Sequence, residues 1–384
     1  MPTASAVRVL CAPDKLRGAL DAPAAARALA VGVRAAGGLP SELPIADGGE
    51  GTLDALAASA RGESTRRGPA GVGPSVPGMG AIEAIDVHDA LGGSRRARLA
   101  ELAPGRFLVE AAEAIPLAAL HAEERDVERA SSAGVGELIA AALDRRARSL
   151  LIAVGGTATV DGGAGALRAL GARCAHDGAG LLADQSVDVS TVDARLAGVE
   201  LTLLVDVDAP LTGPDGAAAR FGPQKGATPA QVVAFDEALG RWGAALGIDP
   251  NASGAGAAGG LGAALQALGA RTVAGADAVL DLCGFDALLR DADLCVTAEG
   301  SVDASTLQGK AVAAVVARCV ATGVPVVVLG GRVDPAAAAE LRRRGARDVR
   351  PLGPSTRPLP EALAAAAADL ESAAAQATRE RRAG

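Results

Sequence analysis

The sequence predicts an α/β protein. A doubly wound parallel-sheet domain is built from both ends of the chain, and a large mixed α/β domain is inserted between them. Near-continuous apolar runs alternate with helical patterns at both chain ends, as expected of parallel strands that are covered on both faces. From residue 80 to residue 111 the pattern changes to short alternating runs joined by turns, which indicates antiparallel strands. The 384 residues also exceed one ordinary core. We expect residues 1–75 and 290–384 to form the first domain and residues 80–285 the inserted one, with the active site in the cleft between them.

The first elements place polar loops at strand ends. A predicted strand over residues 7–12 is followed by the loop APDKLRGAL, and Asp21 then caps a helix over residues 23–36. A short strand over residues 43–46 leads into ADGGEGT and a helix over residues 53–60. Ligands of open α/β sheets bind at the carboxyl ends of strands. The candidate site residues in these two loops are Asp14, Lys15, Arg17, Gly18, Asp47, Gly48, Gly49 and Glu50.

A linker and an antiparallel section come next. Residues 61–80 are rich in glycine and proline without periodicity, which predicts a hinge between domains. Three short strands are predicted at residues 82–87, 96–102 and 107–111, and Glu110 falls late in the third.

Two serines precede the next helix. Ser131 and Ser132 stand before a predicted helix over residues 135–143, and Glu137 lies in its first turn. This arrangement predicts a capping box, in which a serine and a glutamate each bond a free backbone N–H group. Capping explains both serines without a functional role.

The stretch from residue 149 to residue 173, SLLIAVGGTATVDGGAGALRALGAR, organises the predicted site. It reads as a buried strand (150–154), a glycine-rich loop and a helix (164–170). Glycines let backbone N–H groups approach a phosphate, and a helix start offers unpaired N–H groups with partial positive charge. A plain tight turn is the alternative. A similar start, GGLGAALQALGAR, occurs at residues 259–271, and both starts are candidates for holding a polyphosphate. Candidate residues are Gly155, Gly156, Thr157, Asp161, Gly259 and Gly260.

The remaining elements restore the alternation of strands and helices. An aliphatic strand over residues 199–207 ends in Asp206 and Asp208. Further strands are predicted at 293–297, 324–329 and 349–352, and further helices at 229–246, 310–321, 335–344 and 359–379.

Charge and composition exclude several classes of protein. The net charge of −8 and the pI near 5.1 argue against nucleic acid or an anionic membrane as a partner. The longest apolar window, residues 311–331, is interrupted by charge, glycine and proline, so no membrane span is predicted. Five cysteines show no CxxC pair, and Cys11, Cys295 and Cys319 lie in apolar runs. They read as small buried hydrophobic residues of a cytoplasmic protein.

Lysine is used selectively. Only three of the 37 basic Lys and Arg residues are lysines, Lys15, Lys225 and Lys310, and all three lie in glycine-containing motifs: CAPDKLRG, FGPQKGA and STLQGKA. Where a phosphate needs a compact point charge, a guanidinium is no substitute for an ammonium group. The three lysines are therefore candidates for phosphate binding.

The motifs favour phosphoryl transfer over other chemistry. No Walker motif, GxGxxG fingerprint or GxSxG elbow is present, and none of the three histidines lies in a motif. Too few clustered cysteines and histidines occur for zinc. Carboxylates beside glycines at strand ends suit Mg²⁺ and the orientation of an attacking hydroxyl, although each alone could be a turn or cap residue. The eight are Asp14, Asp47, Glu50, Asp161, Asp206, Asp208, Glu299 and Asp303.

In this order, ADGGEGT, GGTATVDGGAGALRALGA, FGPQKGAT, GAGAAGGLG and AEGSVDASTLQGK resemble the motifs of the bacterial glycerate kinase family, the type without a Walker loop. APDKLRGAL and SSAGVGELI match further blocks, so the resemblance runs from residue 12 to about residue 331. It implies ATP-dependent phosphorylation of D-glycerate, with 2-phosphoglycerate favoured over 3-phosphoglycerate, and a two-domain fold with a Rossmann-like domain. ATP and Mg²⁺ are the implied cofactors. No oligomeric state is predicted.

The resemblance assigns roles by position. Asp47 or Asp206 is expected nearest the attacking hydroxyl, and Lys15 with Arg17 at the glycerate carboxylate or the transferred phosphoryl group. The expected substrate residues are Asp14, Arg17, Gly18, Gly48, Gly49 and Glu50. The expected nucleotide or phosphate residues are Gly155, Gly156, Thr157, Asp161, Lys225, Gly259, Gly260 and Lys310. Glu299 and Asp303 are the expected metal ligands, and Glu110 also matches the family pattern.

Four positions depart from the family pattern: Val160 and Ala209 replace asparagine, Ser301 replaces arginine in GEGR, and Ser305 replaces glutamine. If residue 301 contacts an anion, losing its charge-assisted bond costs about 1.5–3 kcal/mol. Two alternatives follow from these departures. One is a kinase for another small hydroxy acid, and the other is a nucleotide- or metabolite-binding protein without catalysis.

Overall fold

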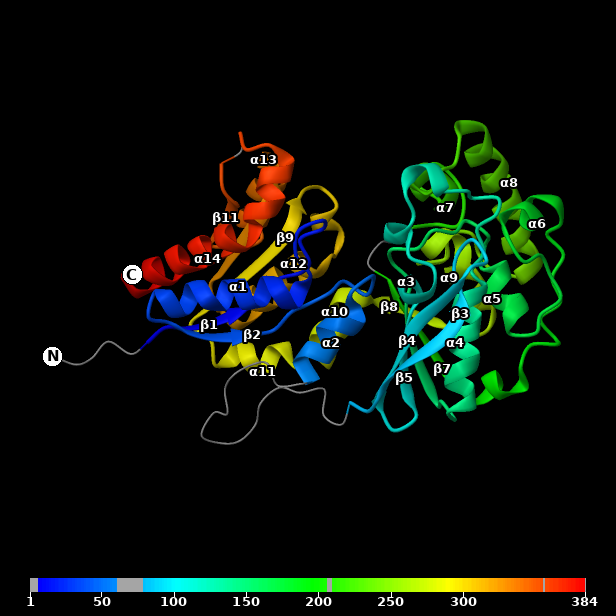
Figure 1. Ribbon diagram of the computed structural model, residues 1–384, viewed down its shortest axis with the longest axis horizontal. Coiled ribbons are helices and arrows are strands. Elements are labelled where there is room, and N and C mark those ends of the chain that lie inside the picture. Colours follow the sequence, from blue (N-terminus) through cyan, green and yellow to red (C-terminus); the bar gives the residue numbers. More distant parts are fainter. Residues whose placement is uncertain (1–5, 61–78, 206–208, 355, 384) are drawn as a thin grey trace. The chain divides into compact units, whose positions relative to one another are not determined.

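The computed structural model describes residues 6–60, 79–205, 209–354 and 356–383. The chain divides into two compact units. Unit 1 comprises Met1–Asp47, Gly51–Gly78 and Ala276–Gly384, and unit 2 comprises Gly48–Glu50 and Met79–Gly275. Each unit contains a sheet and several helices (Figure 1), which confirms the predicted α/β class. The predicted domain boundaries and cleft stay predictions.

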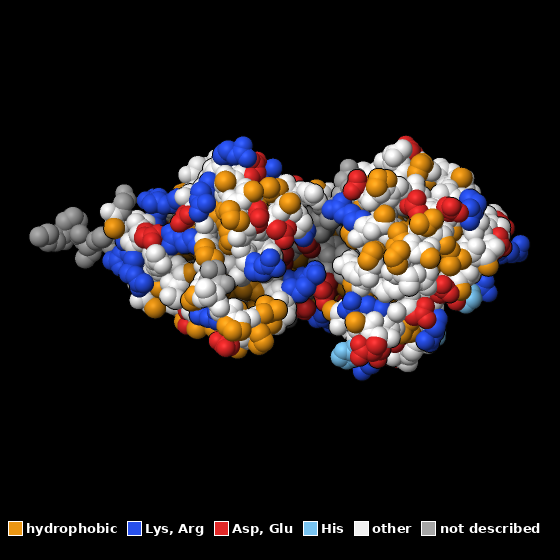
Figure 2. All heavy atoms as spheres, turned by 90° about the horizontal axis from the view of Figure 1, so that it is seen from above, with side chains coloured by type: hydrophobic (Ala, Val, Ile, Leu, Met, Phe, Trp, Pro, Cys, Tyr) orange, Lys and Arg blue, Asp and Glu red, His pale blue; other side chains and the backbone are white. Residues whose placement is uncertain are grey.

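Acidic and basic side chains both lie across the face of the molecule shown in Figure 2, as expected for a chain whose net charge of −8 comes from 45 acidic and 37 basic residues. Among the described residues, every helix is too short or too polar to cross a lipid bilayer. The three histidines are exposed.

The sheet of unit 1 is parallel throughout, in the order β11-β10-β9-β1-β2. Its apolar strands are covered on both faces, as the sequence predicts. The strands are β1 (Arg8–Cys11), β2 (Leu39–Glu42), β9 (Leu294–Val302), β10 (Val326–Val333) and β11 (Asp348–Pro351).

Helices cover both faces of this sheet. Alternate strand residues such as Val9, Val296 and Val327 join one apolar core with α1 and α14, which pack side by side (Figure 1). The intervening residues point to the other face, where α12 packs on β9 and β10. Asp21 caps α1 by accepting from the N–H of Ala24, as predicted. The helices of unit 1 are α1 (Ala22–Ala35), α2 (Thr52–Ala60), α10 (Gly275–Leu282), α11 (Phe285–Arg290), α12 (Ala311–Thr322), α13 (Pro335–Arg343) and α14 (Leu359–Ala383).

The second strand differs from the prediction, which placed it at residues 43–46. The ladder to β1 is formed by Leu39–Glu42 instead. Residues 43–46 are buried and still bond the end of β1 and the chain after it. The Leu43 N–H donates to the carbonyl of Cys11 (2.9 Å), and the Ile45 N–H donates to the carbonyl of Pro13 (3.0 Å). Pro44 has no N–H group to continue a ladder. The apolar run therefore marked burial rather than a strand.

The helices α10 and α11 were not predicted. Both are short, and the partly buried Arg318 of α12 joins them: its guanidinium contacts Asp277, Asp281 and Asp286 at 3.0, 2.6 and 3.2 Å. One arginine with three carboxylates on two neighbouring helices is a long-range arrangement that local periodicity does not reveal.

The sheet of unit 2 is mixed, in the order β3-β4-β5-β6-β7-β8. The first three strands are antiparallel, as predicted, and β5 to β8 are parallel. The strands are β3 (Ile82–His88), β4 (Ser94–Ala103), β5 (Arg106–Glu110), β6 (Ser149–Ala153), β7 (Glu200–Val205) and β8 (Arg271–Ala274). The predicted hinge at residues 61–80 lies largely outside the described residues.

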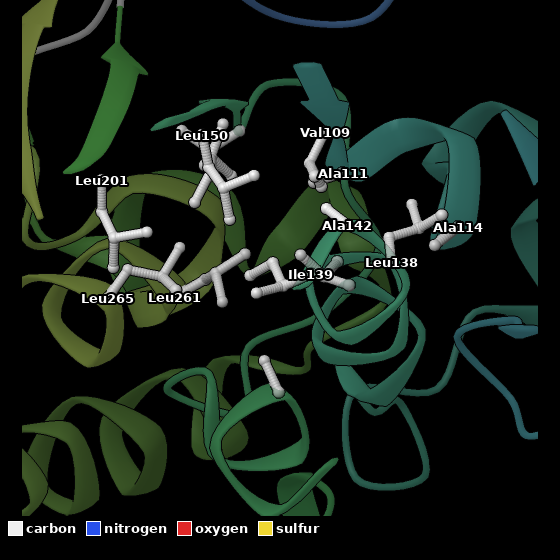
Figure 3. Packing of buried hydrophobic residues seen from close by; sticks show 14 of the residues in the cluster. Val109, Ala111, Ala114, Leu138, Ile139, Ala142, Leu150, Leu201, Leu261 and Leu265 are labelled. Carbon is white, nitrogen blue, oxygen red and sulfur yellow. The ribbon is translucent and has the colours of Figure 1, made fainter. Parts of the chain in front are cut away.

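Aliphatic side chains form the core of unit 2. Figure 3 shows Val109 and Leu150 of the sheet together with Leu138 and Ile139 of α4 and Leu261 of α9. The helices of this unit are α3 (Ala111–Ala114), α4 (Ala133–Asp144), α5 (Ala164–Ala169), α6 (Gly178–Ala183), α7 (Ala217–Phe221), α8 (Pro229–Leu246) and α9 (Leu261–Ala267).

Candidate active site

Three acidic side chains come close together at the carboxyl ends of the strands of unit 1. Asp14 follows β1 and Glu299 lies on β9, the neighbouring strand, and the Asp14 N–H donates to the carbonyl of Ala298 (2.8 Å). Part of Asp14 reaches solvent, yet burial and then the charge of Asp47 raise its pKa to about 8. Burial raises the pKa of Glu299 to about 7, and the charges of Asp303 and Asp47 add to this rise.

Lys15 and Arg17 extend from the turn after Asp14. The N–H of Lys15 donates to Oδ1 of Asp14 (2.7 Å), and the charge of Lys15 opposes the rise in the Asp14 pKa. Leu16 and Leu20 form an antiparallel bridge that closes the turn. Arg17 and Gly18 are exposed on it. The structure therefore brings Asp14, Lys15, Asp47 and Glu299 together, as the strand-end argument predicts.

The loop after β9 is tied into a network. Asp303 Oδ1 accepts from the N–H (2.8 Å) and hydroxyl (2.6 Å) of Ser305, and Oδ2 accepts from the Ser301 hydroxyl (3.1 Å). The bonds from Ser305 lower the pKa of Asp303. Lys310 Nζ donates to Ser305 Oγ (2.9 Å). Two positions that depart from the family pattern thus both hold Asp303.

Glu299 also has a hydroxyl partner that the sequence reasoning missed. Thr306 is fully buried, and its hydroxyl donates to Glu299 Oε1 (2.7 Å). The motif STLQGK contains this threonine, and its place seven residues after a strand-end glutamate was the available signal.

Arg332 was not predicted as a site residue. It lies on β10 in parallel register with Ser301 on β9, so both side chains point to the same sheet face as Glu299. Arg332 is exposed, and in the described part of the chain its guanidinium forms no ion pair or hydrogen bond.

In unit 2, residues 48–50 pack on the loop after β6. A Cβ atom on Gly155 would lie 2.7 Å from Gly49 Cα, and one on Gly156 would lie 2.8 Å from Glu50 Cβ. Glycine is therefore needed at both positions for a close approach of two chain segments. The structure therefore brings these two predicted loops together.

Asp161 is fully buried and organises the start of α5. Its Oδ2 accepts from the N–H (2.8 Å) and hydroxyl (2.7 Å) of Ser132 and from the N–H of Gly165 (3.1 Å). Its Oδ1 accepts from Gly163 N–H (3.1 Å). Burial raises the pKa of Asp161, against the effect of these bonds.

These contacts revise two expectations. Ser132 does not form the predicted capping box: its hydroxyl bonds Asp161 and accepts from the N–H of Ala166, while Glu137 accepts from the N–H of His88 (2.7 Å). The first amides of α5 already have partners from within the chain, so in this structure they are not open to a phosphate. Nucleotide binding by Asp161 itself stays a prediction.

Lys225 lies beneath the same loop. It is 3% exposed, and its Nζ donates to the carbonyl of Thr159 (2.7 Å) and, at 3.4 Å, to the hydroxyl of Thr157. Burial lowers its pKa to about 7, and the charge of Asp161 partly opposes this. Burying an ammonium group costs several kcal/mol unless a charged partner compensates.

The two similar glycine-rich starts pack on each other. Gly162 N–H donates to the carbonyl of Gly259 (3.0 Å), and a Cβ atom on Gly260 would lie 2.9 Å from Gly162 Cα. Val160, at the centre of the first loop, belongs to an apolar cluster with Leu239 and Trp242. The valine that replaces asparagine at this position therefore packs in an apolar core. Ala209 is likewise buried.

Other predicted residues have separate outcomes. Glu110 is buried at the end of β5. Asp206 and Asp208 lie outside the described residues. Within the described ranges, no group of three or more His, Cys, Asp or Glu side chains is arranged to hold a metal ion by itself.

A surface cavity of about 570 Å³ lies in unit 2 but is a poor candidate for the active site. Its lining includes Arg125, Asp126 and Glu128, which already bond Leu120, the N–H of Arg129 and Gln231. Among the predicted motif residues it reaches only Gly226 of FGPQKGA.

Comparison with known proteins decides the family. The model of the glycerate kinase family matches residues 9–381. The chain belongs to the glycerate kinase family. This confirms the resemblance seen in the motifs, and the match spans both units, so the chain is an enzyme of the glycerate kinase type.

Individual members of the glycerate kinase family are similar along most of their length. The chain is 37% identical over 345 residues to the glycerate kinase of Bacillus subtilis strain 168, covering 85% of this chain and 86% of that one. It is 34% identical over 325 residues to the glycerate 2-kinase of Escherichia coli K12, covering 79% and 80%. The crystal structure of a protein assigned as glycerate kinase 2 from Salmonella typhimurium LT2 matches with a TM-score of 0.78 at 33% identity, covering 99% of both chains.

Proposed function

We propose that the protein transfers the γ-phosphoryl group of ATP to D-glycerate, with Mg²⁺, and forms 2-phosphoglycerate. The observation that carries this proposal is the strand-end cluster of Asp14, Asp47 and Glu299 beside Lys15, in a chain of the glycerate kinase family. Two of its carboxyl groups have pKa values of about 8 and 7, close to the range in which a general base is most effective.

Asp14 is the proposed general base. It accepts the proton of the C2 hydroxyl of D-glycerate, the hydroxyl oxygen forms a bond to the γ-phosphorus, and the bond from that phosphorus to the bridging oxygen breaks to release ADP. Asp47 acts through its charge, which raises the Asp14 pKa. Asp206 stays a second candidate for contact with the hydroxyl.

Lys15 and Arg17 are the proposed anion contacts. Both lie on the turn after Asp14, so a glycerate molecule with its hydroxyl at Asp14 has its carboxylate or the incoming phosphoryl group within the reach of these cations. Lys310 is the proposed phosphate contact of this unit, while Gly155, Gly156 and Thr157 are those of unit 2. Gly48–Glu50, packed on that loop, are proposed substrate residues.

Magnesium fits the donor set of unit 1. The carboxylates of Asp14, Asp47 and Glu299 repel one another, and a divalent cation among them relieves that repulsion. Mg²⁺ usually takes one or two protein carboxylates and completes its shell with phosphate and water, so a dedicated protein cage is unnecessary. Glu299 and Asp47 would hold the ion, whereas both oxygens of Asp303 already accept from serines. When bound, the ion would neutralise charge on the phosphates.

The proposal is tested with purified protein, ATP, Mg²⁺ and a panel of acids: D-glycerate, L-glycerate, lactate and tartronate. ADP release that requires D-glycerate supports it. No release above background with D-glycerate overturns the substrate assignment, and release with another acid favours the alternative hydroxy-acid kinase.

Arg332 is the proposed positive charge that binds the acceptor acid. Ser301 supplies no positive charge, but Arg332 lies beside it in register, and within the described residues its guanidinium has no ion pair or hydrogen bond. Arg332→Ala is expected to raise the KM for the acceptor acid about tenfold or more through loss of one charge-assisted bond, with kcat within about threefold. Steady-state kinetics measure this effect. Arg347→Ala, which removes an exposed guanidinium elsewhere in unit 1, serves as the control and leaves the KM unchanged. An unchanged KM in Arg332→Ala contradicts the prediction.

A further inference from the structure

Lys225 occupies an unfavourable position for a residue that only fills space. Its side chain enters the loop after β6 from the short 3-10 helix Pro223–Lys225, and its ammonium group bonds two uncharged oxygens, the carbonyl of Thr159 and the hydroxyl of Thr157. In the described part of the chain it forms no ion pair. Asp161 is the charged group that faces it, but both Asp161 oxygens are occupied by Ser132 and backbone amides.

The hydroxyl of Thr157 links this buried charge to the loop. Because Thr157 Oγ1 accepts from Lys225, its own proton is directed away from the ammonium group and remains available to donate. In the described residues this hydroxyl donates to no other group. Gly155 and Gly156, which precede it, are closely packed by Gly49 and Glu50.

We propose that Lys225 is a positioning residue that acts as a buried counter-charge beneath the segment Gly155–Thr159 and makes the Thr157 hydroxyl a donor to a phosphate oxygen of the ligand. The lysine itself does not touch the ligand. The ligand class is a polyphosphate, and its proposed source is ATP, so this inference rests on the proposed function.

The burial of the Lys225 ammonium group near Asp161 also supports a counter-charge role. The Lys225 pKa of about 7 means that the ammonium form is partly lost at neutral pH without a ligand. A phosphate bound above the loop favours the charged form. ATP affinity is therefore expected to fall as the pH rises from 7 to 9, through loss of this charge.

Lys225→Met tests the proposal because methionine fills nearly the same space without charge. A counter-charge kept for function predicts an unchanged or higher melting temperature, since a costly buried cation is removed. It also predicts that the Kd for ATP, measured by calorimetry, rises about tenfold or more and loses its dependence on pH between 7 and 9. The KM for D-glycerate is expected to stay within about twofold.

Thr157→Val gives an independent variant and a coupling measurement. Thr157→Val is also expected to raise the Kd for ATP. The double variant is expected to bind ATP about as weakly as Lys225→Met, because both substitutions remove the same hydrogen bond to the phosphate. Inorganic triphosphate as the probe separates a phosphate effect from a nucleoside effect: it should show the same loss as ATP.

Each other outcome overturns the proposal. If Lys225→Met is unfolded or clearly less stable, the lysine is structural. If Lys225→Met or Thr157→Val binds ATP with wild-type affinity, the counter-charge role is wrong. If the wild-type protein binds neither ATP nor triphosphate, both this inference and the proposed function fail, whereas ATP binding without turnover of D-glycerate refutes the substrate assignment alone.

Discussion

Asp161→Asn is expected to lower the free energy of unfolding of unit 2 by about 3–5 kcal/mol. Asp161 is fully buried and accepts four hydrogen bonds from Ser132, Gly163 and Gly165. Asparagine has the same shape, but its amide NH₂ group would face one set of these donors and leave buried N–H groups without an acceptor.

Trp242 is a natural probe for this change. It is the one tryptophan of the sequence, it is fully buried, and its Nε1 donates to the carbonyl of Gly162 in the same loop (2.9 Å). Urea unfolding followed by its fluorescence therefore reports the stability around Asp161. Asp188→Asn is the matched control, since Asp188 also accepts from a nearby backbone N–H and hydroxyl, both of Ser190, but lies near the surface. It is expected to cost less than about 1 kcal/mol. A loss that small for Asp161→Asn would contradict the assigned role.

Asp14→Asn is expected to lower kcat by about 10²–10⁴-fold while stabilising unit 1 at pH 8. The activity falls because an amide cannot accept the hydroxyl proton. The stability rises because the wild-type carboxylate is buried and held near Asp47 and Glu299, and asparagine removes both the cost of burying that charge and the repulsion.

The pH dependence of this stability has a definite sign. The folded pKa of Asp14 is about 8, above the value near 3.8 of an unfolded aspartate, so the folded state binds more protons between these values. Wild-type stability from this group is therefore present below about pH 4 and is lost as the pH rises to 8. Asp14→Asn should exceed the wild type in melting temperature at pH 8 by about 2–4 °C or more and match it near pH 4.

Kinetics and calorimetry check the two effects of Asp14→Asn separately. Asp291→Asn, on the surface of unit 1, is the control and should alter neither. Retention of wild-type kcat would exclude Asp14 as the base, and equal melting temperatures at pH 8 would show that its carboxyl is not destabilised.

The wild-type pH profile follows from the same groups. Since a base works in its deprotonated form, kcat is expected to rise with pH and to level off at or below about pH 8, because Mg²⁺ beside Asp14 and Glu299 would lower pKa values that are about 8 and 7 without it. A stopped assay between pH 5.5 and 9 measures this. A profile that is flat from pH 5.5 to 8 would contradict the assignment of either carboxylate.

Local signals predicted the long elements well. Thr228, Pro229 and Gly247 mark both ends of α8, and the structure has a capping box at Thr228 and a left-handed Gly247 at these positions. Short helices such as α6 and α7 were missed because five or six residues show too little periodicity, and the six of α6 include two glycines. The strand expected at residues 43–46 was misplaced because burial and pairing give the same apolar signal.

The sequence predicted which residues gather at the candidate site, but not which of them bond one another. Strand-end positions correctly gathered Asp14 and Glu299, because neighbouring parallel strands end at one edge of a sheet. Asp47 joins them, although its strand ends earlier, at Glu42. The partner of Asp161 is Ser132, 29 residues earlier, and no local pattern pairs them. Likewise, the rarity of lysine singled out Lys225, but only tertiary packing shows that its charge is buried.

Identifying the product tests the proposed phosphoryl transfer to the C2 hydroxyl of D-glycerate. Purified protein is incubated with ATP, Mg²⁺ and D-glycerate, and the mixture is followed by ³¹P NMR with authentic 2- and 3-phosphoglycerate as standards. We expect 2-phosphoglycerate and ADP to appear in equal amounts and only when D-glycerate is present. ATP that stays intact, or ADP that forms without any phosphoglycerate, would contradict it.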